Sequence, residues 1–178
     1  MSPAEETAQG LFLWLAPGEP EGAALARLLL ALARRLGTPP FDPHVTLLGP
    51  VAAPPDEALA RCAELARRLA PLALPLRDVR GEDDYFRALY AAVEPTPALL
   101  AAREAARALL PAPDAPFRPH LSLAYGRLED TAQVALSIEL RPQLPSPVRA
   151  RHLELIRTDG PVRAWRRLGR FDLAAMPS

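Results

Sequence analysis

The sequence predicts an α+β fold with mainly antiparallel β-sheets and helices on the outside. Three observations support this class. Apolar runs typical of strands alternate with segments rich in Ala, Leu and Arg that are typical of helices. Proline-rich connectors and a closing hairpin pattern do not suit one continuous parallel sheet. A seven-residue motif also occurs twice, at residues 41–47 and 117–123, which predicts two related lobes.

The first half of the chain begins with an apolar run, Leu11–Ala16, that reads as a buried strand closed by a Pro-Gly pair. Glu21–Leu36 has helical composition and is followed by Gly37, a glycine stop. Phe41–Pro50 is expected to be the second strand. Asp56–Leu69 is expected to be the second helix, entered from two prolines.

The middle of the chain contains two further strands and a helix. Leu72–Val79 reads as a strand in which Pro75 marks an edge or a bulge. Asp84–Val93, rich in aromatic residues, is expected to be another strand. Thr96–Leu110 is expected to be a helix, because Thr96 is a good N-cap and proline follows it at the first helical position.

The last part of the chain is expected to return to strands. Phe117–Tyr125 reads as a strand and Asp130–Leu140 as a short helix. Val148–Thr158 and Val162–Phe171 are expected to form a closing hairpin around Asp159-Gly160, a strong turn pair.

The composition is that of an ordinary globular chain. Its 178 residues fit one two-lobed domain over residues 1–178, with residues 1–10 as a flexible lead. Cys62 is the single cysteine, so no internal disulfide can form. Acidic and basic residues balance at 21 each, which argues against a long nucleic-acid footprint but not against a small anionic ligand. Every basic residue is arginine, which excludes lysine-based covalent catalysis.

Nothing in the sequence indicates a membrane or secretory segment. No apolar run reaches the roughly 18 residues that a membrane span needs. The first residues include Glu5 and Glu6, where a signal peptide would carry basic residues. We therefore expect a cytoplasmic protein, a monomer, with no membrane partner.

The repeated motif is the most informative feature of the sequence. Residues 41–47 read FDPHVTL and residues 117–123 read FRPHLSL. Side chains alternate between the two faces of a strand. Each histidine, His44 or His120, therefore shares a face with the hydroxyl residue two positions later, Thr46 or Ser122. The aliphatic residues between and after them point to the core.

Two histidines and two hydroxyls converging on one cleft suit a phosphoryl transfer that needs no metal. One neutral histidine can act as general base and the other, protonated, as general acid, because the histidine pKa lies near neutrality. Thr46 and Ser122 would bind the non-bridging phosphate oxygens. Two histidines are too few for a zinc site, and no H-x-H or H-E-x-x-H spacing adds ligands, so we expect neither a metal nor a cofactor. The pattern alone leaves open which of His44 and His120 is the base.

At these residues the sequence resembles the 2H phosphoesterase superfamily, which is named for two H-x-[ST]-x motifs. The flanking residues are similar to its cyclic phosphodiesterase branch, known from plants and yeast. That similarity is carried by residues 41–49 and 119–126, by WLAP at 14–17, by YFRALY at 85–90, and by LELI at 153–156 with Trp165 after it.

The resemblance implies a bilobal, pseudo-twofold arrangement of two mainly antiparallel β-sheets with peripheral helices. It implies hydrolysis of cyclic phosphates, such as nucleoside 2′,3′-cyclic phosphates or ADP-ribose 1″,2″-cyclic phosphate, to a 2′-phosphate. It also implies that His120 activates the water and that His44 protonates the leaving oxygen. Two alternatives stay open: an RNA-end enzyme with 2′,3′-cyclic phosphodiesterase or 2′,5′-ligase activity, and a nucleotide-binding module without catalysis.

Three aromatic residues are candidates for binding the substrate: Trp14, Phe86 and Tyr125. Tyr125 lies five residues after His120, so it can reach the cleft only if the strand ends or bulges near the following glycine. Arg118 shares the face of His120 and is a further candidate for holding phosphate. The arginines between residues 163 and 170 are expected to form a solvated strand face.

Overall fold

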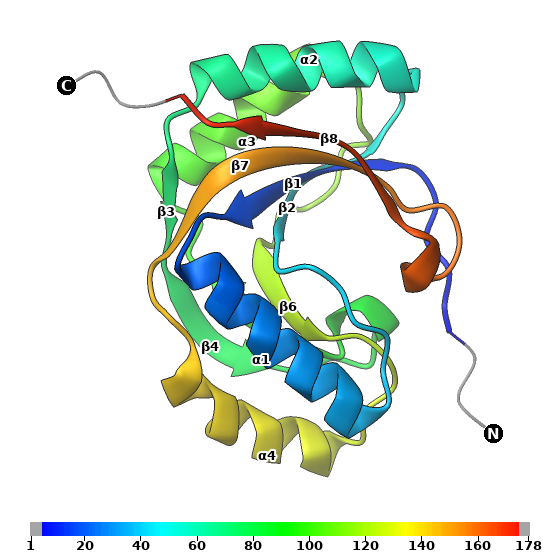
Figure 1. Cartoon of the computed structure of the whole chain (residues 1–178), viewed down its shortest axis with the longest axis vertical. Coiled ribbons are helices and arrows are strands. Elements are labelled where there is room, and N and C mark those ends of the chain that lie inside the picture. The colour runs from blue at the N-terminus through cyan, green and yellow to red at the C-terminus, as the bar shows by residue number, and fades with distance from the viewer. Residues whose placement is uncertain (1–4, 175–178) are drawn as a thin grey trace.

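Antiparallel strand pairing organises the molecule. In the computed structural model, which describes residues 5–174, the strand order is β3-β7-β1-β2-β6-β5-β4, and β8 pairs with β7 outside this path (Figure 1). All the strand pairs between named strands are antiparallel. The strands are β1 Leu11–Pro17, β2 Val45–Val51, β3 Leu72–Leu74, β4 Leu76–Arg80, β5 Leu89–Val93, β6 His120–Ala124, β7 Val148–Arg157 and β8 Arg166–Asp172. The predicted α+β class is confirmed.

The sheet consists of two halves that meet at a narrow seam. One half contains β1, β2, β3, β7 and β8, and the other contains β4, β5 and β6. The residue pair Val45 and Leu121 joins β2 to β6. The two ends of the strand order, β3 and β4, are consecutive in the chain and are separated by Pro75. The sheet therefore curves round into a nearly closed, barrel-like form.

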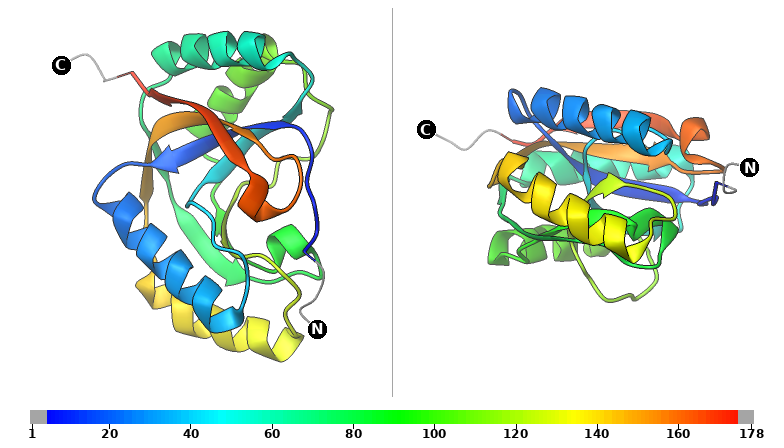
Figure 2. Two further views of the ribbon diagram at one scale, coloured as in Figure 1. Left: turned by 45° about the vertical axis from the view of Figure 1, so that its right-hand side comes forward. Right: turned by 90° about the horizontal axis from the view of Figure 1, so that it is seen from below.

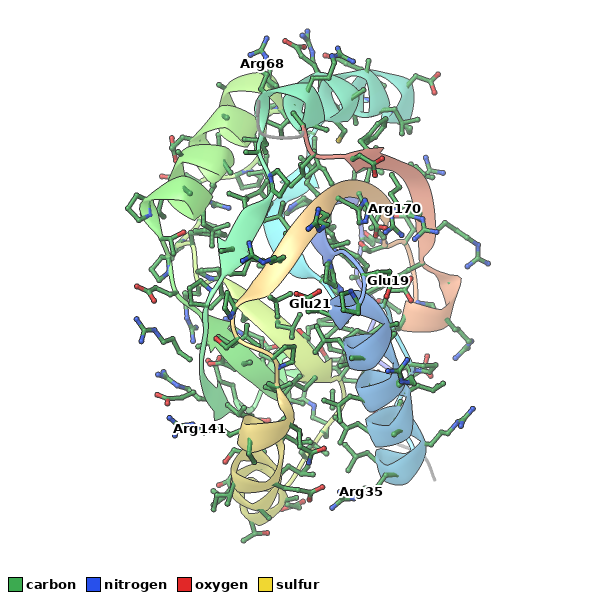
Figure 3. The ribbon with its side chains drawn as sticks, turned by 60° about the vertical axis from the view of Figure 1, so that its left-hand side comes forward. Glu19, Glu21, Arg35, Arg68, Arg141 and Arg170 are labelled. Carbon is green, nitrogen blue, oxygen red and sulfur yellow. The ribbon has the colours of Figure 1, made fainter. Side chains whose placement is uncertain are left out.

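Helices cover the two ends of this curved sheet. They are α1 Glu21–Leu36, α2 Pro55–Arg68, α3 Pro97–Leu109 and α4 Asp130–Leu140, with 3₁₀ turns η1 Tyr85–Arg87, η2 Arg141–Gln143 and η3 Val162–Ala164. α2 packs on β7 and β8, and α3 packs on β2. α1 and α4 lie side by side at the opposite end (Figures 1 and 2). Arg35, labelled in Figure 3, links them by an ion pair to Glu139 at 2.6 Å.

The predicted helix signals act as expected. Gly37 follows α1 with φ 67°, and its N–H donates to the Ala33 carbonyl, a left-handed stop that glycine adopts without strain. The Thr96 hydroxyl accepts a hydrogen bond from the Leu99 N–H at 3.2 Å and starts α3. The short helix predicted over Asp130–Leu140 is α4.

Five predicted strands differ from the structure. The strand predicted from Val162 begins only at Arg166, because residues 162–164 form the 3₁₀ turn η3. The strands predicted from Phe41 and Phe117 begin only at Val45 and His120. The segment Leu72–Val79 is divided at Pro75 into β3 and β4, because proline has no N–H to donate to a strand ladder. The strand predicted over Asp84–Val93 starts only at Leu89.

The error at Asp84–Val93 has a local cause. The Asp84 carboxylate accepts a hydrogen bond from the Phe86 N–H at 2.9 Å, and this contact turns residues 85–87 into the 3₁₀ turn η1. Side chains on a 3₁₀ turn do not alternate between two faces, so neighbouring residues can point to the same side. This turn contributes two residues to the site described below.

The closing hairpin is present, but its connection is longer than predicted. β7 and β8 pair antiparallel, and η3 lies between them. The Asp159-Gly160 pair contacts the N-terminal segment: the Gly160 N–H donates to the Ala8 carbonyl at 3.0 Å, and Asp159 accepts from the Gly10 N–H at 3.0 Å. The described part of the predicted flexible lead, residues 5–10, is thus in contact with the hairpin. Residues 1–4 lie outside the described residues.

The core fills the space between the sheet and the helices. It contains fully buried leucines from β1, β2, β6 and β7 together with apolar faces of all four helices. A smaller cluster, formed around Tyr85, Tyr125 and Val162, lies against Phe86 and Trp165. Among the helices of residues 5–174, none combines the length and apolar character needed to cross a bilayer.

Candidate active site

The two repeated motifs meet in one cavity of about 320 Å³. Seven of the eight residues proposed from the sequence line it: His44, His120, Thr46, Ser122, Trp14, Phe86 and Tyr125. The eighth, Arg118, does not line this cavity. The other lining residues are Ala8, Phe12, Asp84, Arg87, Thr158 and Trp165.

The seam between β2 and β6 brings the motifs together. Val45 pairs with Leu121 in an antiparallel register. One step along each strand, this register sets His44 opposite Ser122 and Thr46 opposite His120. Each histidine is therefore adjacent to the hydroxyl of the other motif as well as its own. The aliphatic residues between them are 1% exposed, which agrees with the alternation expected from the sequence.

Both histidines are held by the same local hydrogen bond. His44 Nδ1 lies 2.7 Å from the Asp42 carbonyl oxygen, and His120 Nδ1 lies 2.8 Å from the Arg118 carbonyl oxygen. A carbonyl only accepts, so Nδ1 carries the hydrogen in each ring. The nitrogen left for chemistry is Nε2, which can accept a proton when the ring is neutral.

His44 is deeply buried. It is 5% exposed, and the Trp14 ring stacks on it with centroids 3.4 Å apart and planes 6° from parallel. Phe41 meets the imidazole edge-on at 6.1 Å, and the Tyr125 hydroxyl lies 3.5 Å from Nε2. Burial lowers the pKa of His44 to about 3, because the imidazolium would lose its hydration.

His120 has a more open and more polar environment. The Tyr90 ring meets its imidazole edge-on at 5.3 Å. Partial burial lowers its pKa, and the positive charges of Arg87 and Arg118 add to this effect. The two histidines thus share their hydrogen bonding but differ in their surroundings.

The two hydroxyl residues differ in burial. Thr46 is partly exposed, whereas Ser122 is 4% exposed. Ser122 Oγ donates to the Phe86 carbonyl at 3.4 Å, which is long for a hydrogen bond between two oxygens. An anion in the cavity offers a stronger acceptor for this hydroxyl, because charge-assisted hydrogen bonds are shorter and stronger.

The aromatic candidates occupy the cavity in different ways. Trp14 is 5% exposed and covers His44, while Tyr125 is 3% exposed and stacks on Phe41 at 3.9 Å. Tyr125 reaches the cavity because β6 ends at Ala124, one residue before it. Phe86 is partly exposed on η1 and contacts Tyr125 edge-on at 5.4 Å. Of these three, Phe86 offers the most ring surface to a ligand.

Six lining residues were not proposed from the sequence, and the three with the largest side chains are Phe12, Arg87 and Trp165. Phe12 lies two positions before Trp14 on β1, so strand alternation could have found it. Arg87 follows Phe86 and reaches the same cavity only because both are on a 3₁₀ turn. Trp165 reaches it from the η3–β8 junction, and no periodic pattern indicates this.

The cavity has few groups suited to holding a metal. Asp84 is the carboxylate in its lining, and its two oxygens already accept from the Phe86 N–H and pair with Arg87 at 3.3 Å. Within residues 5–174, no three His, Cys, Asp or Glu side chains are grouped so as to ligate a metal ion. Arg87, in contrast, gives the cavity a permanent positive charge.

An antiparallel α+β fold with two opposed His-x-[Thr/Ser] pairs defines the class as 2H phosphoesterase. Comparison with known families agrees. The family model of the 2′-5′ RNA ligase superfamily matches residues 24–161. The chain belongs to this superfamily, whose members are 2H phosphoesterases. No curated protein sequence matched the chain.

Solved structures share the fold over nearly the whole chain. TT0787 of Thermus thermophilus is 24% identical with a TM-score of 0.58, over 94% of this chain and 99% of that one. E. coli LigT complexed with phosphate is 18% identical with a TM-score of 0.54, over 95% and 99%. E. coli LigT complexed with 3′-AMP is 20% identical with a TM-score of 0.56, over 93% and 98%.

Proposed function

We propose that this protein is a metal-independent cyclic phosphodiesterase that hydrolyses 2′,3′-cyclic nucleotides or related cyclic phosphates to a 2′-phosphate. The observation that carries the proposal is the opposed arrangement of His44, Thr46, His120 and Ser122 across the β2–β6 seam in one cavity. Phosphate and 3′-AMP in the E. coli LigT structures support a nucleotide phosphate as the ligand.

The reaction uses the two Nε2 atoms. A neutral imidazole accepts a proton from water as the water oxygen attacks phosphorus. The other imidazole, protonated, donates its proton to O3′ as the P–O3′ bond breaks, which leaves the phosphate on O2′. Thr46 and Ser122 donate hydrogen bonds to the non-bridging oxygens. The anionic substrate itself raises the pKa of both histidines, so one of them can carry the required proton.

The order of the roles can be argued in two ways. Burial keeps His44 neutral more strongly than His120, which favours His44 as the base. The family resemblance instead makes His120 the base. A substrate with sulfur in place of O3′ separates the two, because a thiolate leaves without needing a proton. The alanine variant of the acid regains activity on this substrate, and the variant of the base does not.

The main test is hydrolysis in EDTA. Purified protein is incubated with each 2′,3′-cyclic nucleotide, and the products are separated from 2′- and 3′-phosphate standards. The proposal predicts turnover in EDTA and a 2′-phosphate product. Activity that vanishes in EDTA and returns with a divalent ion would contradict the metal-independent mechanism. Binding without turnover in either condition would favour a nucleotide-binding module.

The second candidate is an RNA-end enzyme that opens 2′,3′-cyclic phosphates on RNA or joins RNA ends through 2′,5′ linkages. It is favoured by the family match to the 2′-5′ RNA ligase superfamily. An RNA oligonucleotide ending in a cyclic phosphate, with and without a 5′-hydroxyl acceptor strand, tests it directly. A higher kcat/KM on the oligonucleotide than on the mononucleotide would make RNA the preferred substrate. A monomeric state and a cytoplasmic location stay predictions.

A further inference from the structure

A second hollow opens on the other side of His120. It has a volume of about 230 Å³ and shares two lining residues, Arg87 and His120, with the catalytic cavity. A ligand placed against His120 in the catalytic cavity therefore has this hollow as its neighbour. The remaining lining residues are Arg80, Tyr90, Ala92, Val93, Pro95, Phe117, Arg118 and Pro119.

The lining of the hollow is rich in guanidinium groups. Three of its ten lining residues are arginines, Arg80, Arg87 and Arg118, and none of the ten is acidic. Arginine suits phosphate binding, because its planar guanidinium presents several fixed donors and keeps its charge at any working pH. The side chains of Arg80 and Arg118 are 58% and 56% exposed, so both can reach a ligand from solvent.

Carboxylates outside the lining pair with these arginines, and Asp78 lies 3.4 Å from Arg80. Glu82 pairs with Arg118, lies 3.1 Å from Arg87, and accepts a hydrogen bond from the Tyr90 hydroxyl at 2.6 Å. Glu82 does not line the hollow. It therefore positions the guanidinium groups of Arg87 and Arg118 from outside the lining of the hollow.

The two sides of the catalytic centre thus have different chemistry. Around His44 the lining is aromatic, with Trp14, Tyr125 and Trp165. Beyond His120 it is formed by guanidinium groups. A nucleotide fits this division if its base lies on the aromatic side, its cyclic phosphate between the histidines and another phosphate beyond His120.

We propose that the hollow lined by Arg80, Arg87 and Arg118 is a binding site for a second phosphate of the substrate. The inference rests on the proposed function, because it places the scissile phosphate between His44 and His120. The second phosphate is either a 5′-phosphate on the same nucleoside or the phosphodiester on the 5′ side of an RNA end. Both present anionic oxygens to the same arginines.

The kinetic test compares substrates that differ in this phosphate. kcat/KM is measured for adenosine 2′,3′-cyclic phosphate, for its 5′-phosphorylated form, and for the dinucleotide ApA with a terminal cyclic phosphate. The 5′-phosphorylated form or the dinucleotide is expected to be preferred by about tenfold or more, the effect of one or two charge-assisted hydrogen bonds. The substrate with the larger gain in kcat/KM shows whether the second phosphate is a 5′-phosphate or an RNA phosphodiester.

Variants connect the preference to the hollow. In Arg80→Gln and Arg118→Gln the preference ratio is expected to fall toward one. Arg77→Gln is the matched control, because Arg77 lies on the same strand as Arg80, pairs with Glu94, and lines neither the catalytic cavity nor this hollow. It should keep the wild-type ratio. Equal kcat/KM for all three substrates, or a preference that survives both glutamine variants, would overturn the proposal.

A binding measurement separates this inference from the proposed reaction. Isothermal titration of adenosine 2′-phosphate and adenosine 2′,5′-bisphosphate needs no turnover. The bisphosphate is expected to bind about tenfold more tightly to the wild type, and less so to Arg118→Gln. Tighter binding of the bisphosphate without hydrolysis of any cyclic substrate would support the phosphate site and contradict the proposed activity. Equal affinity for both ligands would contradict the site whatever the activity.

Discussion

The two repeated motifs use the same local geometry in two different environments. In each, the histidine Nδ1 donates to the carbonyl two residues earlier. His44, however, is covered by Trp14 and Phe41, whereas His120 lies beside Tyr90 and a group of arginines. The motif phenylalanines differ as well: Phe41 stacks on Tyr125, whereas Phe117 lies under the Arg103 guanidinium at 4.4 Å.

The comparison shows that two kinds of contact act on each histidine. The motif sets the tautomer and direction of each imidazole through bonds within a few residues. Residues from distant parts of the chain set how readily each ring takes up a proton, because burial and neighbouring charges determine the pKa. A duplicated motif can therefore supply an acid and a base from one local design.

The largest expected effect comes from removing either histidine. His44→Ala and His120→Ala should each lower kcat by about 10²–10⁴-fold, the range for a lost general acid or base. The double variant should be little slower than the slower single variant, since both groups act in the same step. Steady-state kinetics on a 2′,3′-cyclic nucleotide measure this. His152→Ala is the control, because His152 pairs with Asp172 away from the cavity. Strictly additive losses would argue for independent roles.

The hydroxyl residues test whether the two halves are also equivalent in phosphate binding. Thr46→Val and Ser122→Ala should each lower kcat/KM by about 10- to 100-fold, because each removes one hydrogen bond to a charged oxygen. The same kinetic assay measures both. Ser137→Ala on α4 serves as control, since that hydroxyl bonds within its own helix at 2.8 Å. Unchanged kinetics in either variant would show that the hydroxyl removed does not bind the phosphate.

The burial of His44 should make folding stability depend on pH. Below the ordinary histidine pKa of 6.5 the unfolded chain binds a proton at this residue, whereas the folded chain does so only near 3. The free energy of unfolding is therefore highest above pH 6.5 and falls as the pH is lowered. The loss should be about 2 kcal/mol between pH 6.5 and about pH 5, a window in which carboxylates stay ionised. Urea denaturation of wild type and His44→Asn measures this. A loss of equal size in His44→Asn would assign it to other groups.

The last prediction concerns activity and stability least directly, because it changes the environment of one histidine toward that of the other. Trp14→Leu removes the ring stacked on His44 and admits water, so the pKa of His44 should rise from about 3 toward 6.5. NMR titration of the imidazole Hε1 signal follows this change. Trp165→Leu is the control, because Trp165 contacts Trp14 edge-on at 5.9 Å and is not the ring stacked on His44. An unchanged pKa in Trp14→Leu would show that other groups exclude the water.

The convergence of the two motifs on one cavity could be predicted from sequence because it depends on strand periodicity. His44 and Thr46 share a face, and the same holds in the second motif, since alternation is a property of any strand. The repeat indicated that the two strands would meet. The strand starts at Val45 and His120 were missed, because the prolines before the histidines do not by themselves show where pairing begins.

The surroundings of the site could not be predicted in the same way. Arg87 was missed because residues 84–93 read as one strand, and only the hydrogen bond between Asp84 and the Phe86 N–H reveals the turn. The unequal burial of His44 and His120 depends on Trp14 and Tyr90, which reach them from other strands. Contacts between distant segments carry no periodic signal in a single sequence.

The pairing of Val45 with Leu121 at the seam also bears on the orientation in which the cavity binds its substrate. An antiparallel pair has local twofold symmetry, so its backbone places the two histidine–hydroxyl pairs in equivalent positions about a phosphate bound between them. Direction must then come from asymmetric features at the two ends of the cavity. We therefore expect that exchanging the aromatic lining at one end with the arginine lining at the other would reverse which ribose oxygen leaves, whereas altering the histidines would not.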